Sequence, residues 1–162
     1  MTAIAQASLR TDGRKIERLL VTPTALNTML WRVVAVTPDG YLEGFRSMLD
    51  RDPRMTFDVY PRGEALYDAV RDYPPVARVV WFTQGLFKMS ERDGNVIISD
   101  LRMGQEPYYS FTFIVGQRQG PVIAAVPPVH LREQHDARTG IVWLWRRMWG
   151  EKLPPPIDAR PR

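Results

Sequence analysis

The sequence predicts an α+β fold, a mostly antiparallel sheet built of hairpins with two or three helices packed on it. Three tight turns that contain glycine, at residues 37–40, 91–94 and 117–120, each separate two runs rich in apolar residues. The length supports the same prediction, because 162 residues, 44% of them hydrophobic, are enough to bury one sizeable core. We therefore expect a single α+β domain over residues 16–150.

The first part of the chain is expected to begin with a helix and to continue as strands. Residues 1–10 are rich in alanine and lack a clear N-cap, so residues 1–15 are predicted to form an N-terminal helical tail. Residues 16–21 follow as a strand. On the two sides of the first turn, residues 31–36 and 41–48 alternate in side-chain character, which indicates an antiparallel hairpin.

The rest of the chain is expected to supply a helical segment, two further hairpins and a final helix. Apolar residues recur at helical spacing in the segment 64–73, and a short second helical turn is expected after Pro74-Pro75. A tryptophan-rich helix precedes a proline-rich end that is predicted to be disordered. The expected strands span residues 82–90, 95–100, 109–116 and 122–126, the last helix spans 138–149, and the tail spans 151–162.

The segment Asp100-Leu-Arg-Met-Gly-Gln-Glu-Pro-Tyr-Tyr109 places three charges and two phenols beside predicted strands. Charges in such a position need partners. Arg102 lies between the two carboxylates and is expected to keep both ionised. With Arg32 and Arg46 of the first hairpin, this segment predicts either a structural network of ion pairs or an anion-binding pocket.

The candidate ligand-binding residues combine these charges with two tryptophans that could form the walls of a pocket. They are Trp31, Arg32, Trp81, Asp100, Arg102 and Glu106. The residues by themselves leave both interpretations open.

The sequence has no strong pattern of a metal centre or an activated nucleophile. The only histidines, His130 and His135, stand five residues apart in a proline-flanked connection, which favours a solvated loop over a zinc site completed by Glu133 and Asp136. The absence of cysteine excludes disulfides, thiolate metal sites and a cysteine nucleophile. We therefore assign no catalytic residue and no metal ligand. The alternative is a small hydrolase that uses Glu106 with one of the histidines, and a divalent ion, on a phosphate or acyl substrate.

The C-terminal helix carries apolar residues on more than one side. Ile141, Leu144, Trp145 and Met148 form one stripe at helical spacing, which is predicted to face the core. Tryptophans and arginines outside that stripe are typical of a helix at a membrane surface. The candidate membrane-facing residues are Trp143, Arg146, Arg147 and Trp149. The alternative is that these tryptophans pack into a groove of the sheet.

The net charge of +4 is concentrated near the C-terminus, where residues 132–162 contain seven basic and four acidic residues. Such a segment could face anionic lipid or nucleic acid. Only three of the 22 basic residues are lysines, and we attribute this excess of arginine to a GC-rich genome rather than to a nucleic-acid surface. No run approaches the roughly 18 apolar residues of a membrane-spanning helix, so the chain is expected to be soluble.

Several separated segments together resemble the C-terminal region of a known family. They are Leu19-Leu-Val-Thr-Pro-Thr-Ala-Leu-Asn-Thr-Met-Leu-Trp-Arg-Val-Val34, the strand from Tyr41 to Asp50, Trp81-Phe-Thr-Gln-Gly85 and the segment from Asp100 to Tyr109. The order of these segments resembles that in the membrane-bound metal-dependent hydrolase family, some of whose members are LexA-regulated. The resemblance extends from Leu19 to Gly150. The resemblance implies a bacterial inner-membrane protein whose N-terminal half carries the transmembrane helices and the metal-binding His and Asp residues.

The sequence contains neither the hydrophobic spans nor the His-containing motif of that N-terminal half. No catalytic residue of the family can therefore be assigned to this sequence. The resemblance implies a divalent metal only for the N-terminal half. The expected function is that of a non-catalytic interaction or regulatory module, the C-terminal domain of a hydrolase-like protein on the cytoplasmic side of the bacterial inner membrane. Its expected partners are its own membrane half or the membrane surface, and a small anionic ligand, but not nucleic acid. A small hydrolase or an anionic-membrane-binding module are the alternatives.

Overall fold

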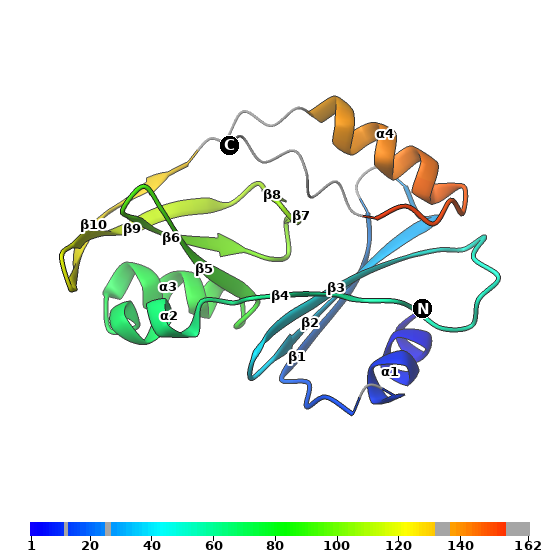
Figure 1. Ribbon diagram of the computed structural model, residues 1–162, viewed down its shortest axis with the longest axis horizontal. Helices are drawn as coiled ribbons and strands as arrows, with labels where there is room; N and C mark the ends of the chain where they lie inside the picture. Colours follow the sequence, from blue (N-terminus) through cyan, green and yellow to red (C-terminus); the bar gives the residue numbers. More distant parts are fainter. Residues whose placement is uncertain (12, 25–26, 132–136, 155–162) are drawn as a thin grey trace. The chain divides into compact units, whose positions relative to one another are not determined.

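The computed structural model describes residues 1–11, 13–24, 27–131 and 137–154. The α+β class is confirmed, because four helices accompany antiparallel sheets built largely of hairpins in this part of the chain (Figure 1). The glycines at the ends of the three predicted turns, Gly40, Gly94 and Gly120, have positive φ angles of 151°, 73° and 62°. These are backbone conformations that glycine adopts without a steric penalty, so the turn chemistry was predicted correctly.

The chain divides into two compact units, whereas a single domain over residues 16–150 was expected. The first unit consists of residues 1–60 together with the C-terminal segment from residue 135, and the second unit consists of residues 61–134. Each unit has its own four-stranded sheet. Local sequence patterns predict hairpins but not which hairpins share a core, and this explains the difference.

The sheet of the first unit is formed by four consecutive antiparallel strands in the order β1-β2-β3-β4. Their bounds are β1 Arg18–Pro23, β2 Leu30–Thr37, β3 Gly40–Ser47 and β4 Asp58–Tyr60. The turn between β2 and β3 is tight, since Thr37 pairs directly with Gly40. β4 is short and pairs only with the first part of β3, from Tyr41 to Glu43, so the second half of β3 forms an open edge next to the loop that precedes β4.

Helix α1 (Thr2–Thr11) confirms a helix within the predicted N-terminal helical tail of residues 1–15, and it packs on this sheet. Ala5 and Leu9 are buried against β2 and β3, where they contact Val33 and Ala35. The Ser8 hydroxyl also accepts a hydrogen bond of 3.0 Å from the backbone N–H of Met55. Burial of these apolar side chains supplies the stabilisation that a short, uncapped helix lacks by itself.

Helix α4 (Ala137–Met148) also belongs to the first unit and packs near the end of the β2–β3 hairpin. Trp143 is buried among Leu30 and Phe45, with the Trp143 and Phe45 rings in an edge-to-face arrangement and their centroids 4.8 Å apart. Leu144, Met148 and Leu153 complete this small core. The contact joins segments about one hundred positions apart in the sequence, so local patterns could not reveal it.

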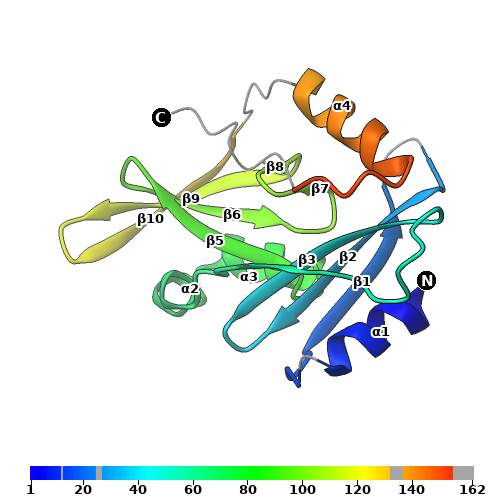
Figure 2. The ribbon, with the colours of Figure 1, turned by 45° about the vertical axis from the view of Figure 1, so that its right-hand side comes forward.

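The second unit has a sheet in the order β10-β9-β6-β5 and two helices against one of its faces (Figure 2). The helices are α2 Glu64–Val70 and α3 Pro74–Phe82, and the strands are β5 Phe87–Arg92, β6 Asn95–Asp100, β9 Thr112–Gln119 and β10 Val122–His130. A small ribbon, β7 Gly104–Gln105 and β8 Tyr108–Tyr109, lies between β6 and β9 in the chain. Both predicted hairpins are therefore present, although residues 82–86 precede β5 and do not belong to it.

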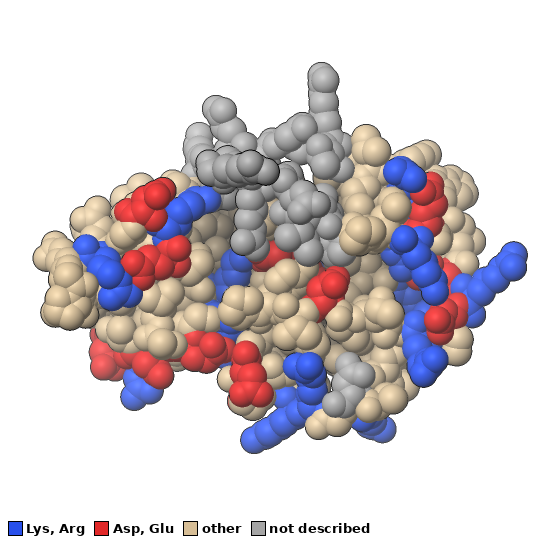
Figure 3. All heavy atoms as spheres, viewed as in Figure 1, with Lys and Arg blue, Asp and Glu red and all other residues tan. Residues whose placement is uncertain are grey.

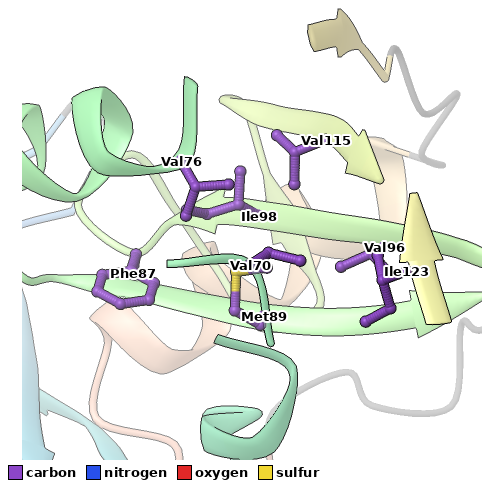
Figure 4. Packing of buried hydrophobic residues seen from close by; sticks show 8 residues of the cluster. All are labelled: Val70, Val76, Phe87, Met89, Val96, Ile98, Val115 and Ile123. Atoms are coloured by element: carbon purple, nitrogen blue, oxygen red, sulfur yellow. The ribbon is translucent and has the colours of Figure 1, made fainter. Parts of the chain in front are cut away.

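The core of the second unit lies between the two helices and the sheet (Figure 4). Val70 from α2 and Val76 from α3 meet Phe87 and Met89 of β5 in this core. The inward residues of each strand alternate with outward ones, as the period of a half-buried strand requires. The side chains Val96, Ile98, Val115 and Ile123 from the other strands complete the cluster.

Candidate functional site

The charged segment that starts at the end of β6 lies in the second unit and forms one local ion pair, between Asp100 and Arg102, and one longer-range pair. Asp100 is buried, and both of its carboxylate oxygens accept hydrogen bonds from the Arg102 guanidinium, with Nη2 to Oδ2 at 2.8 Å. The backbone N–H of Arg102 donates to the same carboxylate at 2.8 Å. The hydrogen bonds with Asp100 raise the pKa of Arg102 above its ordinary value. Arg102 also lies over the ring of Phe82, 4.6 Å from its centroid.

Glu106 has a different principal partner from the one predicted. Its Oε2 lies 2.6 Å from Nζ of Lys88 on β5, and both side chains are largely buried. The Lys88 ammonium also lies 4.9 Å from the centroid of the Tyr109 ring, a cation–π geometry. Sequence analysis did not select Lys88, because nothing in the local pattern of β5 indicates that its outward face receives a carboxylate from the β7–β8 segment.

The remaining candidates are distributed over both units. Trp31 and Arg32 lie on β2 in the first unit, where the Arg32 guanidinium pairs with Glu43 of β3 and both side chains are almost completely buried. Trp81 lies on α3 in the second unit and is 80% exposed. Of the six proposed ligand-binding residues, the structure places Asp100 and Arg102 in direct contact.

The histidines give no metal centre within the described residues. Nε2 of His130, on β10, lies 3.0 Å from the backbone carbonyl oxygen of Ser110, and its ring lies beside that of Phe113. His135, Glu133 and Asp136 lie outside the described residues. In the part of the chain that is described, no three side chains of the His, Cys, Asp and Glu types are grouped closely enough to hold a metal ion.

Helix α4 is rotated relative to the orientation predicted from its apolar stripe. The side facing the sheet carries Trp143 and Arg147, both only 7% exposed, with Leu144 and Met148 beside them. Ile141 and Trp145, which were predicted to lie in the core, are instead 63% and 60% exposed. Trp143 and Arg147 therefore lie on the inner face and not on a membrane-facing side. Both faces of this helix are apolar, so the partners of Trp143 and Arg147 decided the orientation.

The inner face of α4 is fixed by polar contacts as well as by packing. The Arg147 guanidinium forms two hydrogen bonds to the Asp50 carboxylate, at 2.8 and 2.6 Å, and a third to the carbonyl oxygen of Phe45 at 2.9 Å. Ser47 donates to the carbonyl oxygen of Met148 at the end of the helix. A bidentate arginine–carboxylate pair of this kind is among the stronger and more directional contacts in proteins. The helix is thus held in one orientation on β3.

The described part of the C-terminal tail packs against the same helix. The indole N–H of Trp143 donates to the carbonyl oxygen of Pro154 at 2.6 Å, and Leu153 joins the core around Phe45. The prediction of a disordered tail from residue 151 is therefore wrong for residues 151–154. A buried tryptophan needs a hydrogen-bond acceptor for its N–H, and the tail supplies it. Residues 155–162 lie outside the described residues.

The attachment of α4 to β3 is expected to depend on pH through the ionisation of Asp50. Burial by itself raises the pKa of Asp50, but the hydrogen bonds from Arg147 and the backbone N–H of Ser47, with the charges of Arg147 and Arg46, lower it below the ordinary value of 3.8. A carboxyl with a lowered folded-state pKa stabilises the fold above its unfolded pKa, and this contribution disappears as the pH falls through the folded-state value.

We predict that Asp50→Asn lowers the free energy of unfolding at pH 7 and that the difference from the unchanged protein shrinks below about pH 4. Urea unfolding of both proteins at pH 7, 4 and 3 measures this difference. The exposed Asp68, on α2, provides the control, because Asp68→Asn is expected to leave the pH dependence nearly unchanged. A difference for Asp50→Asn that stays constant between pH 7 and pH 3 would contradict the assignment.

The outer face of α4 is apolar and exposed. Ile141, Val142, Trp145 and Trp149 are 57–63% exposed, and the rings of the two tryptophans contact each other with centroids 5.9 Å apart. Leu49, itself 47% exposed, lies next to Gly150, so the apolar surface continues from the helix onto the loop after β3. We call this surface, formed by Ile141, Val142, Trp145, Trp149 and Leu49, the α4 outer face.

Charged side chains lie near the C-terminal end of α4 and in the loop after β3. Figure 3 shows a mostly tan surface over α4, with basic and acidic residues near its C-terminal half. The neighbouring loop and the helix end contain four exposed basic residues and two acidic ones. The basic residues are Arg51, Arg54, Arg146 and Lys152, and the acidic ones are Asp52 and Glu151. The border of the surface therefore has a small excess of positive charge.

Comparisons with known proteins leave the family open. No family model, no curated protein and no solved structure matches the chain. None of the helices in the described residues is long and apolar enough to cross a membrane.

Proposed function

We propose that this chain is a non-catalytic interaction module that works next to the bacterial inner membrane, as the cytoplasmic C-terminal part of a protein similar to metal-dependent hydrolases. Its own membrane half and the membrane surface are the partners that this proposal implies. The observation that carries the proposal is the α4 outer face, because a rigidly attached helix presents two tryptophans and two aliphatic residues to solvent.

The construction of α4 favours binding over a purely structural role. One side of the helix already provides the packing and the ion pair that attach it to β3. The opposite side adds nothing to that attachment, and exposing large apolar side chains is unfavourable unless a partner covers them. Tryptophans with a basic border are typical of helices that lie at the surface of a lipid bilayer.

The charges around α4 favour an anionic surface as the partner. The exposed basic residues outnumber the acidic ones beside the α4 outer face, and attraction to anionic lipid acts over about one Debye length. Insertion of the tryptophans between headgroups adds a contribution that salt does not screen. We expect, therefore, that binding to vesicles weakens with salt but depends on the tryptophans at every salt concentration.

We predict that the protein sediments with vesicles of phosphatidylcholine and phosphatidylglycerol, and binds vesicles of phosphatidylcholine alone more weakly. Replacing both exposed tryptophans of α4, Trp145→Ala with Trp149→Ala, is expected to weaken binding at least about tenfold, because each replacement loses apolar burial worth about 1–3 kcal/mol. Co-sedimentation over a range of lipid and salt concentrations measures the affinity.

Trp81 provides a matched control, since it is the most exposed tryptophan among the described residues and lies on α3. Trp81→Ala is expected to leave vesicle binding unchanged. The proposal fails if the protein stays in the supernatant with anionic vesicles, or if Trp81→Ala weakens binding as much as the Trp145 and Trp149 replacements do. Circular dichroism of each variant establishes that the fold is retained.

A further inference from the structure

A cavity of about 250 Å³ lies in the first unit, at the open edge of β3 beyond the point where β4 ends. Its walls come from β3, the loop before β4, the inner face of α4 and residues 152–154. The volume equals that of roughly eight water molecules in the liquid and is just below the roughly 300–1,000 Å³ of typical ligand sites, so only a small ligand fits. The cavity includes none of the residues of the α4 outer face, although Asp52, Arg54 and Lys152 of its wall also belong to the charged group near that face.

Arg46 is the unusual residue of this cavity. It is only 8% exposed, yet its guanidinium forms no salt bridge within the described residues. Its two hydrogen bonds go to the carbonyl oxygens of Arg54 and Asp50, at 3.4 and 3.3 Å, both longer than is usual for this kind of bond. The Asp50 carboxylate interacts with the charge of Arg46, but both of its oxygens accept hydrogen bonds from Arg147. A bound anion would give the buried Arg46 guanidinium a direct partner of its own.

The other charges of the wall partly cancel. Arg147 is held by Asp50, and the exposed Lys152 lies 3.6 Å from Asp52. Arg54 adds a second guanidinium, and Asp58 adds one carboxyl, whose pKa is raised by partial burial. One excess positive charge remains in the wall, and it favours a singly charged anion, because Asp58 repels a ligand with several negative charges.

The rest of the wall is mainly apolar. Phe45, Met55, Trp143, Leu153 and Pro154 line the cavity, together with Thr56. A ligand that fits this lining carries an anionic group at one end and an apolar body at the other. We propose that the cavity binds a small monocarboxylate with an aromatic or aliphatic body, the carboxylate on Arg46 and Arg54 and the body against Phe45 and Trp143.

Benzoate is the probe for this proposal, and benzamide is its uncharged counterpart of nearly the same shape. Isothermal titration calorimetry with the full chain is expected to show benzoate binding at least about tenfold tighter than benzamide, because a charged hydrogen-bonded pair is lost with the amide. Benzoate is also expected to bind tighter than inorganic phosphate, which has no apolar body. Equal binding of benzoate and benzamide, or phosphate binding as tight as benzoate, would overturn the proposal.

Variants locate the site. Arg46→Met keeps an unbranched apolar stem and removes the guanidinium with its charge, and we expect it to weaken benzoate binding at least about tenfold. Arg54→Met is a second test on an exposed residue, which remains informative if Arg46→Met fails to fold. Arg51→Met, in the same loop but not in the wall of the cavity, is the matched control and is expected to bind benzoate normally. Benzoate binding that survives Arg54→Met unchanged, or that is lost equally in Arg51→Met, would contradict the assignment.

Discussion

Arg147→Ala is expected to lower the free energy of unfolding by about 3–5 kcal/mol, which is a large part of the stability of a small domain. Arg147 is buried, and it holds the Asp50 carboxylate and the carbonyl oxygen of Phe45 together beneath α4. Its removal leaves the Asp50 charge buried beside an unfilled space. Urea unfolding monitored by tryptophan fluorescence measures the change.

The neighbouring arginine provides a matched control for this prediction. Arg146 is exposed on the same turn of α4 and pairs with Glu151 at the surface. Arg146→Ala is expected to leave the unfolding midpoint almost unchanged, since surface ion pairs contribute little. The double change Arg147→Met with Asp50→Leu tests the mechanism, because removing both charges together is expected to recover most of the lost stability. If Arg147→Ala alone is as stable as the unchanged protein, α4 is not held by this pair.

Glu43→Ala is expected to have an effect of the same size, about 3–5 kcal/mol, at the centre of the first unit. Glu43 and Arg32 are 1% and 3% exposed and form an ion pair between β3 and β2. Loss of the carboxylate leaves the Arg32 guanidinium buried without its main counter-charge. Thermal unfolding by circular dichroism and urea titration both report this change.

The second unit offers the matched control for Glu43→Ala. Glu91 and Arg118 likewise form an ion pair between strands, here a bidentate one, but both residues are exposed. Glu91→Ala is therefore expected to shift the melting temperature within experimental error. Glu43→Ala with Arg32→Leu is expected to be more stable than Glu43→Ala alone. A Glu43→Ala protein that melts at the original temperature would show that the pair does not stabilise the sheet, and would make ligand binding a better explanation of Arg32.

These variants also separate stability from binding. The Arg147 and Glu43 replacements act on packing and are expected to alter unfolding first. The Trp145 and Trp149 replacements remove side chains that are exposed, so they are expected to change vesicle binding while the fold remains intact. If a variant loses vesicle binding but keeps its stability, the α4 outer face has a binding function. A loss of stability alone would not show this.

Much of the secondary structure was predictable because its signals are local. A turn such as Thr37-Pro-Asp-Gly40 requires a particular backbone conformation, and glycine in the turn indicates it directly. The alternating side-chain character along β2 and β3 likewise indicates two paired strands, because successive side chains of a strand point to opposite faces of the sheet. The burial of α1 was missed, because its few apolar side chains do not show whether a sheet is available to cover them.

The candidate site was less predictable, because its residues find their partners far along the chain. Asp100 and Arg102 are two positions apart, and their contact follows from the local sequence. Glu106 pairs with Lys88 on another strand, and Arg46 approaches the loop before β4. The sequence contains one indication of Arg46, because an arginine within a half-buried strand is unusual. Nothing in the sequence indicated which residues surround it in the cavity.

The sequence by itself determined the α+β class, the three hairpin turns and the presence of a tryptophan-rich helix near the C-terminus, because each depends on the conformational preferences of neighbouring residues. Only the tertiary structure decided that the chain forms two units and which side of α4 faces solvent. Both sides of that helix are apolar, so its own pattern cannot orient it. The orientation comes from Asp50 and Phe45, which bind Arg147 and Trp143 across a long separation in sequence.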